Sequence, residues 1–457
     1  MEGSKDKRRE LFESENVEKT LKKLAIPGIV AMLISAIYNI VDSYFVGLLG
    51  SSEAMAAVAV AFPLFILIAA VGQMFGVGAA SYISRLLGKK DMEEANKAGS
   101  TTFFTAIVVS VIFTVIGFIF MSKLLRVFGA SDEVMVYALD YSRVLILGAT
   151  FTILNMTLNN MIRAEGSPKY SMIAIIIGAV LNIVFDPIFM FVFGMGVKGA
   201  AIATVLGQGI STIFLIAYYL KGKSTVKISL KNFTFSKRIY AQVMQIGIAT
   251  FARQALSSLA MGLINNAANP YGTAAVASVG INLRIMSMVI YVVFGYCQGF
   301  QPLAGFNYGA KEYKKLNRAI KYSLKVTTIY CTVSSVLLIA FAPVVVGVFS
   351  SDPEVIRIGS MMIRYMCVLT PLFGFQNVYA TLFQALGKGK QALALSVARQ
   401  GIFLIPAALI LPGILGITGL ALIQPTADFL TIILTVVMAF HFRGYLKDKD
   451  EAVIEVA

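Results

Sequence analysis

Long apolar runs alternate with short polar or glycine-rich breaks along almost the whole chain. Most runs are long enough to supply the ~20 residues of a membrane-spanning helix. They are too long for tilted barrel strands and lack a strict alternation of apolar and polar positions, so they predict helices. The twelve predicted spans are 24–47, 54–84, 98–121, 134–161, 171–193, 200–220, 241–266, 274–302, 322–348, 356–383, 393–415 and 419–441.

Composition agrees with this pattern. Of the 457 residues, 58% are apolar and 14% are charged, whereas soluble domains average about 45–50% apolar and about 25% charged. These values exclude a soluble enzyme, a disordered chain and a secreted disulfide scaffold. They predict an all-α polytopic membrane protein with little material outside the bilayer. The three cysteines lie in apolar runs and the single histidine, His441, ends the last span, so no zinc, haem or other cofactor is expected.

Basic residues are distributed unevenly between the two sides of the predicted spans. Of 39 Lys and Arg, 29 lie in the two tails and in the loops that follow even-numbered spans, and three lie in the alternate loops. By the positive-inside rule, both termini are cytoplasmic. The net charge of +15 is therefore a topology signal with a secondary attraction to anionic lipid, and no nucleic-acid partner is predicted.

The two halves of the chain resemble each other. At an offset of 221 residues, Arg143 falls on Arg364 and Gly166 falls on Gly387. A repeat of six spans keeps its orientation, so we predict two parallel six-helix bundles related by a pseudo-two-fold axis along the membrane normal. The predicted organisation is a tail 1–23, a first bundle 24–220, a linker 221–240, a second bundle 241–441 and a tail 442–457.

Acidic residues inside the spans are costly and therefore informative. A charge at the bilayer centre costs about 2.5–3.5 kcal/mol on insertion scales. Asp42 in the first span and Asp186 in the fifth are predicted at similar depth. Asn182 precedes Asp186 by four residues and Tyr38 precedes Asp42 by four, so each lies on the same helical face as its acid. We predict a cation-coupling site at these four residues.

Further oxygens and prolines accompany this site. Thr204 in the sixth span could add a hydroxyl, and Pro187 directly follows Asp186. Pro27 opens the first span. Prolines free backbone carbonyls and permit bending, so both are expected to serve conformational change. Such oxygens suit a proton or Na⁺, which Asp42 and Asp186 could hold.

Other polar residues inside the spans are candidates for a substrate cavity. These candidates are Gln73, Arg253, Gln298 and Asp428. Asp428 has an alternative explanation, an ion pair with Arg399. Methionine and aromatic residues could line a cavity for planar apolar cations, although most are expected to be ordinary packing.

The sequence resembles the multidrug and toxic compound extrusion (MATE) family, in particular its MepA-like bacterial branch. The resemblance covers about residues 15–445 and is carried by IPGIVAMLISAIYNIVDSYFVG in the first span and LNIVFDPIFMFVFGMGVKGAAIATVLGQ across the fifth and sixth. It implies a bacterial inner-membrane transporter, with coupling at Asp42, Asn182, Asp186 and Thr204 and bending at Pro27. Another branch carries acids in the seventh and tenth spans, which this chain lacks.

These observations lead to one expected function and its alternatives. We expect a monomeric antiporter, not an enzyme, that exports organic cations or amphipathic compounds in exchange for H⁺ or Na⁺. A flippase for lipid-linked oligosaccharides or a natural-product exporter on the same fold is the alternative. That alternative calls for a basic cavity, so it depends on where four arginines lie. They are Arg253, Arg284, Arg364 and Arg399.

Overall fold

The computed structural model describes residues 10–454, with side chains for residues 10–446, so the outer parts of both predicted tails lie outside it. Every long element in the described part is a helix. In chain order these are α2 (Val17–Gly47), α3 (Ser52–Gly88), α4 (Met92–Val127), α5 (Asp132–Leu147), α6 (Ala149–Ala164), α7 (Pro168–Pro187), η1 (Ile188–Val192), α8 (Gly196–Leu220), η2 (Leu230–Asn232), α9 (Lys237–Ala268), η3 (Asn269–Tyr271), α10 (Thr273–Gly309), α11 (Tyr313–Ala340), α12 (Ala342–Gly347), α13 (Pro353–Ala385), α14 (Gly389–Val397), η4 (Ala398–Phe403) and α15 (Leu404–Ile454).

Each predicted span is helical in the structure. Nine helices of the described residues are long and apolar enough to cross a membrane, and α5 with α6, bent by 50°, forms a tenth. The stretch from α14 to α15 contains two spans, because the backbone leaves the helical region at Gly416 (φ 61°, ψ −138°). Helix α9 is the remaining one; with 32 residues it is long enough, but it carries more polar residues. The predicted all-helical membrane fold is confirmed.

Several helices extend beyond the predicted apolar runs. Helix α10 ends at Gly309 rather than near 302, and α15 reaches Ile454 rather than 441. Hydropathy marks only the part of a helix that faces lipid, whereas the backbone hydrogen bonds continue into the polar zone.

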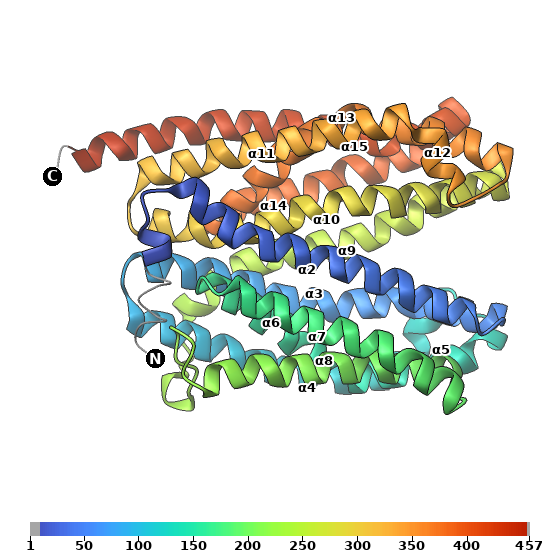
Figure 1. Ribbon diagram of the computed structural model, residues 1–457, viewed down its shortest axis with the longest axis horizontal. Coiled ribbons are helices and arrows are strands. Elements are labelled where there is room, and N and C mark those ends of the chain that lie inside the picture. The colour runs from blue at the N-terminus through green and yellow to red at the C-terminus, as the bar shows by residue number, and fades with distance from the viewer. Residues whose placement is uncertain (1–9, 455–457) are drawn as a thin grey trace.

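The helices form two bundles, α2–α8 and α9–α15, which we call the first and second bundle (Figure 1). Within them α3 packs on α6 and α7 on α8, and α10 and α11 pack on α13. Between them, α3 contacts α9 and α2 contacts α10. The start of α2 and the end of α15 lie at the same end of the molecule, the terminal end, and α2 diverges from α10 toward the far end (Figure 1).

Glycines allow the bundles to approach closely at the terminal end. A Cβ at Gly299 would lie 2.5 Å from the Cα of Ala25, and one at Gly28 would lie 2.4 Å from the carbonyl oxygen of Gly295. The two bundles therefore contact each other backbone to backbone in the halves of α2 and α10 nearest the termini.

The segment before α2 also belongs to this contact. Phe12 is 3% exposed, and its ring stacks on Phe306 of α10 with centroids 4.8 Å apart. Lys315 of α11 forms an ion pair with Glu15 at 2.8 Å. The Thr20 hydroxyl donates a hydrogen bond to the carbonyl of Leu11, which connects the segment back to α2.

Candidate functional site

The two intramembrane acids of the first bundle lie side by side. Asp42 of α2 and Asp186 of α7 are brought together because these helices pack along each other, and their carboxyl groups contact each other. Asp186 is completely buried, whereas Asp42 is half-buried. Two carboxylates in contact repel each other when both are ionised, and a proton or cation between them relieves the repulsion.

Asn182 connects this pair to α8. Its amide Nδ2 donates to Asp186 Oδ1 at 3.3 Å and to Thr204 Oγ1 at 3.2 Å. Glycines again set the spacing, since a Cβ at Gly207 would lie 2.8 Å from the carbonyl oxygen of Gly178. Helices α7 and α8 are therefore close enough for Thr204 to reach the site.

Three oxygens of this cluster have no hydrogen-bond partner within the described part of the chain. They are Asp42 Oδ1, Asn182 Oδ1 and Asp186 Oδ2, and all three are buried. Buried polar atoms are normally satisfied, and each of these atoms can only accept when the acids are ionised. Two carboxylates, an amide oxygen and a hydroxyl form a donor set that fits a hard cation, and a proton would serve the carboxylates equally.

Two tyrosines border the acids. Tyr38 of α2 and Tyr141 of α5 both lie close enough to Asp42 and Asp186 to interact with their charges. Tyr141 is 9% exposed, and the sequence interpretation missed it. A single tyrosine in an apolar run has no pattern that would reveal it, and only the packing of α5 against α3 and α8 brings it here.

The two prolines lie in different settings. Pro27 is buried inside α2, which continues through it as one helix. Pro187 is the last residue of α7, and the chain then changes to the π-helical segment η1. Proline lacks the N–H that would continue the helix, and π-helical turns are frequent beside functional sites. The irregular turn directly follows Asp186.

The predicted cavity residues do not converge on one place. The side chain of Gln73 bonds inside the first bundle, where its Oε1 accepts from Asn160 at 3.0 Å. Gln298 is half-buried on α10, beside Gly28 at the contact between the bundles, and its Oε1 is unsatisfied within the described residues. Neither of them touches the acid pair in any recorded hydrogen bond.

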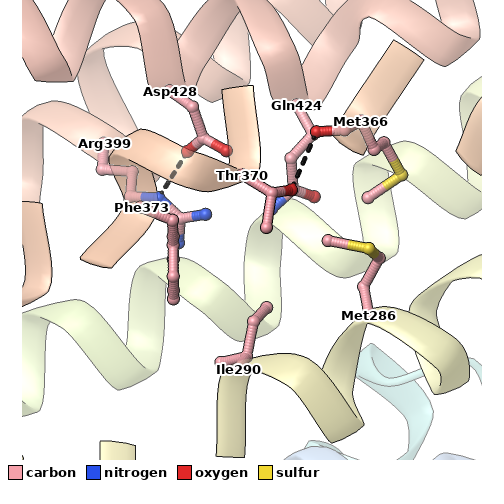
Figure 2. Close-up of a pocket in the computed structure, with 8 residues that line it drawn as sticks. All are labelled: Met286, Ile290, Met366, Thr370, Phe373, Arg399, Gln424 and Asp428. Atoms are coloured by element: carbon pink, nitrogen blue, oxygen red, sulfur yellow. Dashed lines mark hydrogen bonds and ion pairs between the residues drawn. The ribbon is translucent and has the colours of Figure 1, made fainter. Parts of the chain in front are cut away.

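A separate cavity lies in the second bundle (Figure 2). It is narrow, and about 300 Å³ of space not filled by atoms lies within it, open solvent included. Its lining residues are Met286, Ile290, Met366, Thr370, Phe373, Arg399, Gln424 and Asp428. Arg399 Nε donates to Asp428 Oδ1 at 2.7 Å, so the ion pair considered for Asp428 is present. Arg284 and Arg364 are exposed.

No group of three or more His, Cys, Asp or Glu side chains that could hold a metal ion is found within residues 10–446. The acid pair alone supplies two carboxylates. The four-residue donor set described above also needs the amide oxygen of Asn182 and the hydroxyl of Thr204.

Comparison with known proteins identifies the class of this protein. The family model MatE matches residues 27–188 and again residues 248–410, and the second match begins 221 residues after the first. The chain belongs to the MatE family of multidrug efflux transporters. The double match agrees with the repeat inferred at the same offset.

Individual relatives extend over the full length. Multidrug export protein MepA of Staphylococcus aureus is 28% identical over 453 residues, which are 99% of this chain and 100% of MepA. A MOP superfamily transporter from Pyrococcus furiosus has 28% identity and a TM-score of 0.90, covering 96% of this chain and 98% of that one. An outward-facing multidrug resistance MATE transporter has the same identity and coverage and a TM-score of 0.91. The predicted likeness to MepA is confirmed.

Proposed function

We propose that the protein is a secondary antiporter that exports organic cations or amphipathic drugs in exchange for inward H⁺ or Na⁺. The observation that carries this proposal is the set of three unsatisfied acceptor oxygens on Asp42, Asn182 and Asp186. These buried oxygens can accept hydrogen bonds or bind a cation but cannot donate. Burying ionisable acids in a membrane costs free energy, and such residues usually serve a function, which here would be a conformational step driven by cation binding.

Orientation follows from the basic residues. Because 29 of 39 Lys and Arg lie in the tails and in the loops that follow even-numbered spans, we place the terminal end in the cytoplasm of a bacterial cell, with the lipid bilayer around the helices. The bundles meet at this end and diverge toward the other (Figure 1). With this orientation we infer an outward-facing state, and the half-buried Asp42 would be the acid that a cation from outside meets first.

The mechanism uses the two charge states of the acid pair. When both acids are ionised, they repel each other and attract a cationic substrate or the coupling ion. An entering proton or Na⁺ removes the repulsion, lets α2 repack around Pro27 and disfavours the substrate, which leaves outward. The irregular turn after Pro187 lets the α7 side of the site adjust.

Stoichiometry decides which gradient drives export. One proton exchanged for one monovalent cation moves no net charge. Two inward cations per substrate would add ~2.3 kcal/mol per 100 mV, or roughly fiftyfold in accumulation. The two acids, Asp42 and Asp186, permit either ratio.

The test is efflux from proteoliposomes with proton and sodium gradients imposed separately. Asp42→Asn should abolish gradient-driven efflux while the protein inserts and folds. The matched control is Asp140→Asn, because Asp140 is also an acid of the first bundle but is half exposed and only 3.9 Å from Arg143. Full pumping by a well-folded Asp42→Asn protein would refute the proposal.

The alternative, a lipid-linked oligosaccharide flippase or natural-product exporter, needs a basic central cavity. Of the four arginines considered, Arg399 lines the cavity of Figure 2. Arg253 lies over Phe294, whose ring centroid is 6.3 Å from that of the cavity residue Phe373, whereas the other two arginines are exposed. Two arginines and one acid have a net charge of only +1, which would bind a multiply charged pyrophosphate group weakly. We therefore favour drug export. Both bundles and the acid site belong to a single chain, and we propose a monomer.

A further inference from the structure

Two arginines in the second bundle lie against a pair of aromatic rings. Arg253 of α9 places its Cζ 5.5 Å from the ring centroid of Phe294, and Arg399 of η4 places its Cζ 5.2 Å from that of Phe373. The two rings are 6.3 Å apart. The cluster therefore brings two guanidinium groups, from elements 130 or more residues apart in the chain, to one place inside the membrane region.

The charges of this cluster do not balance. Asp428 forms an ion pair with Arg399 at 2.7 Å, but within the described residues Arg253 has neither an ion pair nor a hydrogen-bond acceptor. The charge of Arg399 acts on Arg253, so the two cations repel each other. In addition, Arg399 Nη2 is buried without a partner in the same part of the chain. One positive charge is left over.

An unpaired guanidinium in this position is expensive unless it has a use. A charged side chain in the membrane costs about 2.5–3.5 kcal/mol on insertion scales, and the faces of Phe294 and Phe373 offset only part of this. A planar fork with free N–H groups is suited to a carboxylate or another anionic group. The neighbouring cavity supplies an apolar wall of Met286, Ile290 and Met366 and the polar ends of Thr370 and Gln424.

We infer that Arg253 and Arg399 form a binding site for the anionic group of an amphiphilic substrate. Among the amphipathic compounds of the proposed function, this site prefers those that carry a carboxylate or comparable anion beside an aromatic or aliphatic body, zwitterions included. This inference rests on the proposed function for its transport step. It assigns the substrate's anion to the second bundle and leaves the coupling cation to the acid pair of the first.

The experiment compares two dyes that differ at one group, a rhodamine with a free carboxylate and its methyl ester. Binding is measured by fluorescence anisotropy on the full-length protein in nanodiscs. Arg253→Gln should weaken binding of the acid dye about tenfold or more, which is the size of a lost charged hydrogen bond, and change binding of the ester less than twofold. Arg253→Lys should retain part of the preference, and the exposed Arg284→Gln is the matched control.

A second variant makes the test independent of Arg253. Asp428→Asn removes the acid that neutralises Arg399, so it should tighten binding of the acid dye several-fold with little effect on the ester. Equal loss of both dyes in Arg253→Gln, no loss of the acid dye, or no tightening in Asp428→Asn would each overturn the inference. Failure of the proposed antiport has a different signature. The wild-type protein would then bind the acid dye selectively, but an imposed H⁺ or Na⁺ gradient would drive export of neither dye.

Discussion

At the scale of single residues, the free-energy cost of burying polar groups in the first bundle falls on a few oxygen atoms. Asp186 is completely buried and Asn182 is 2% exposed, yet each keeps an oxygen without a partner in the described structure. Structural polar residues in a membrane are usually satisfied by neighbouring helices. The unsatisfied oxygens therefore indicate a site that is completed by something from outside the chain.

Asn182 can be tested without changing the charge of the site. Asn182→Leu removes the amide that donates to Asp186 and to Thr204, together with one acceptor oxygen. The ion concentration for half-maximal efflux should rise about tenfold, since a hydrogen bond to a charged group contributes about 1.5–3 kcal/mol. Ion titrations in proteoliposomes measure this. Asn39→Leu, at an exposed site on α2, is the control, and an unchanged titration of Asn182→Leu would contradict the assignment.

Glu15 predicts a pH dependence at the terminal end. The ammonium of Lys315 lowers the pKa of the Glu15 carboxyl below its ordinary value. A lowered folded-state pKa means that the ion pair stabilises docking above the ordinary pKa of about 4.3 and loses this effect as the pH falls through the folded-state value. Glu15→Gln should thus loosen the segment before α2 at pH ~7, and this effect should shrink as the pH falls below the ordinary pKa of the carboxyl.

The mobility of a spin label at Ser14→Cys reports this docking. The effect should be small, because Glu15 is exposed and surface ion pairs are screened by salt. The control is Glu18→Gln, at a neighbouring exposed acid that forms no ion pair with any residue of the described part of the chain. A Glu15→Gln effect that persists unchanged at pH ~3 would contradict the electrostatic explanation.

At the scale of helices, glycine positions decide where elements can approach. Helix α10 contains one glycine at a close contact and one that faces open space. Gly299 faces the backbone of α2, with a Cβ placed there 2.5 Å from Ala25 Cα, whereas a Cβ at Gly280 would meet nothing within 4 Å. The contact between the bundles is thus steric and localised.

Gly299→Ala should therefore push the bundles apart at the terminal end. Overpacking typically costs about 1–3 kcal/mol, which would shift the balance away from the state described here by a factor of about 5 to 150. Pulsed EPR distances between spin labels at the terminal ends of α3 and α9 measure this shift. Gly280→Ala should leave the distances as they are, and an equal response of both variants would contradict the steric argument.

At the scale of the whole molecule, closure at the terminal end involves both bundles and the segment before α2. The Phe12 ring stacks on Phe306 of the second bundle and covers Gly166 of the first, where φ is +79° and a Cβ would lie 2.7 Å from the ring. Phe12 thus bridges the two bundles in the state in which they meet. Opening of this end would separate these contacts.

Phe12→Ala should weaken that closure. Truncation of a buried phenylalanine typically costs about 3–5 kcal/mol. Because the ring contacts the second bundle only when the terminal end is closed, part of this loss destabilises the closed state relative to the state in which that end is open. The same EPR distances should broaden toward longer values, and the apparent affinity for outside ion should fall. Phe235→Ala, at a position 81% exposed, is the control. Unchanged distances in Phe12→Ala would show that the ring does not hold this end closed.

Much of the fold could be predicted because lipid imposes strong local constraints. Apolar run length predicts helices, and an even repeat predicts parallel bundles. The same local information misjudged helix ends, as at α15, but it did separate the last two spans, 393–415 and 419–441, where the backbone leaves the helical region at Gly416. Hydropathy averages over many residues, so it does not locate the residue at which a helix ends in the polar zone.

For the candidate site, the sequence by itself determined the chemistry and the tertiary structure decided the geometry. Asp42, Asn182 and Asp186 are recognisable as misplaced polar residues because each is costly in its own span. Their convergence, the addition of Tyr141 and the excess charge at Arg253 depend on helices far apart in sequence. Such contacts arise from the packing of whole helices, which the membrane drives through shape and hydrogen bonding rather than hydrophobicity, and a pattern along one chain does not encode it.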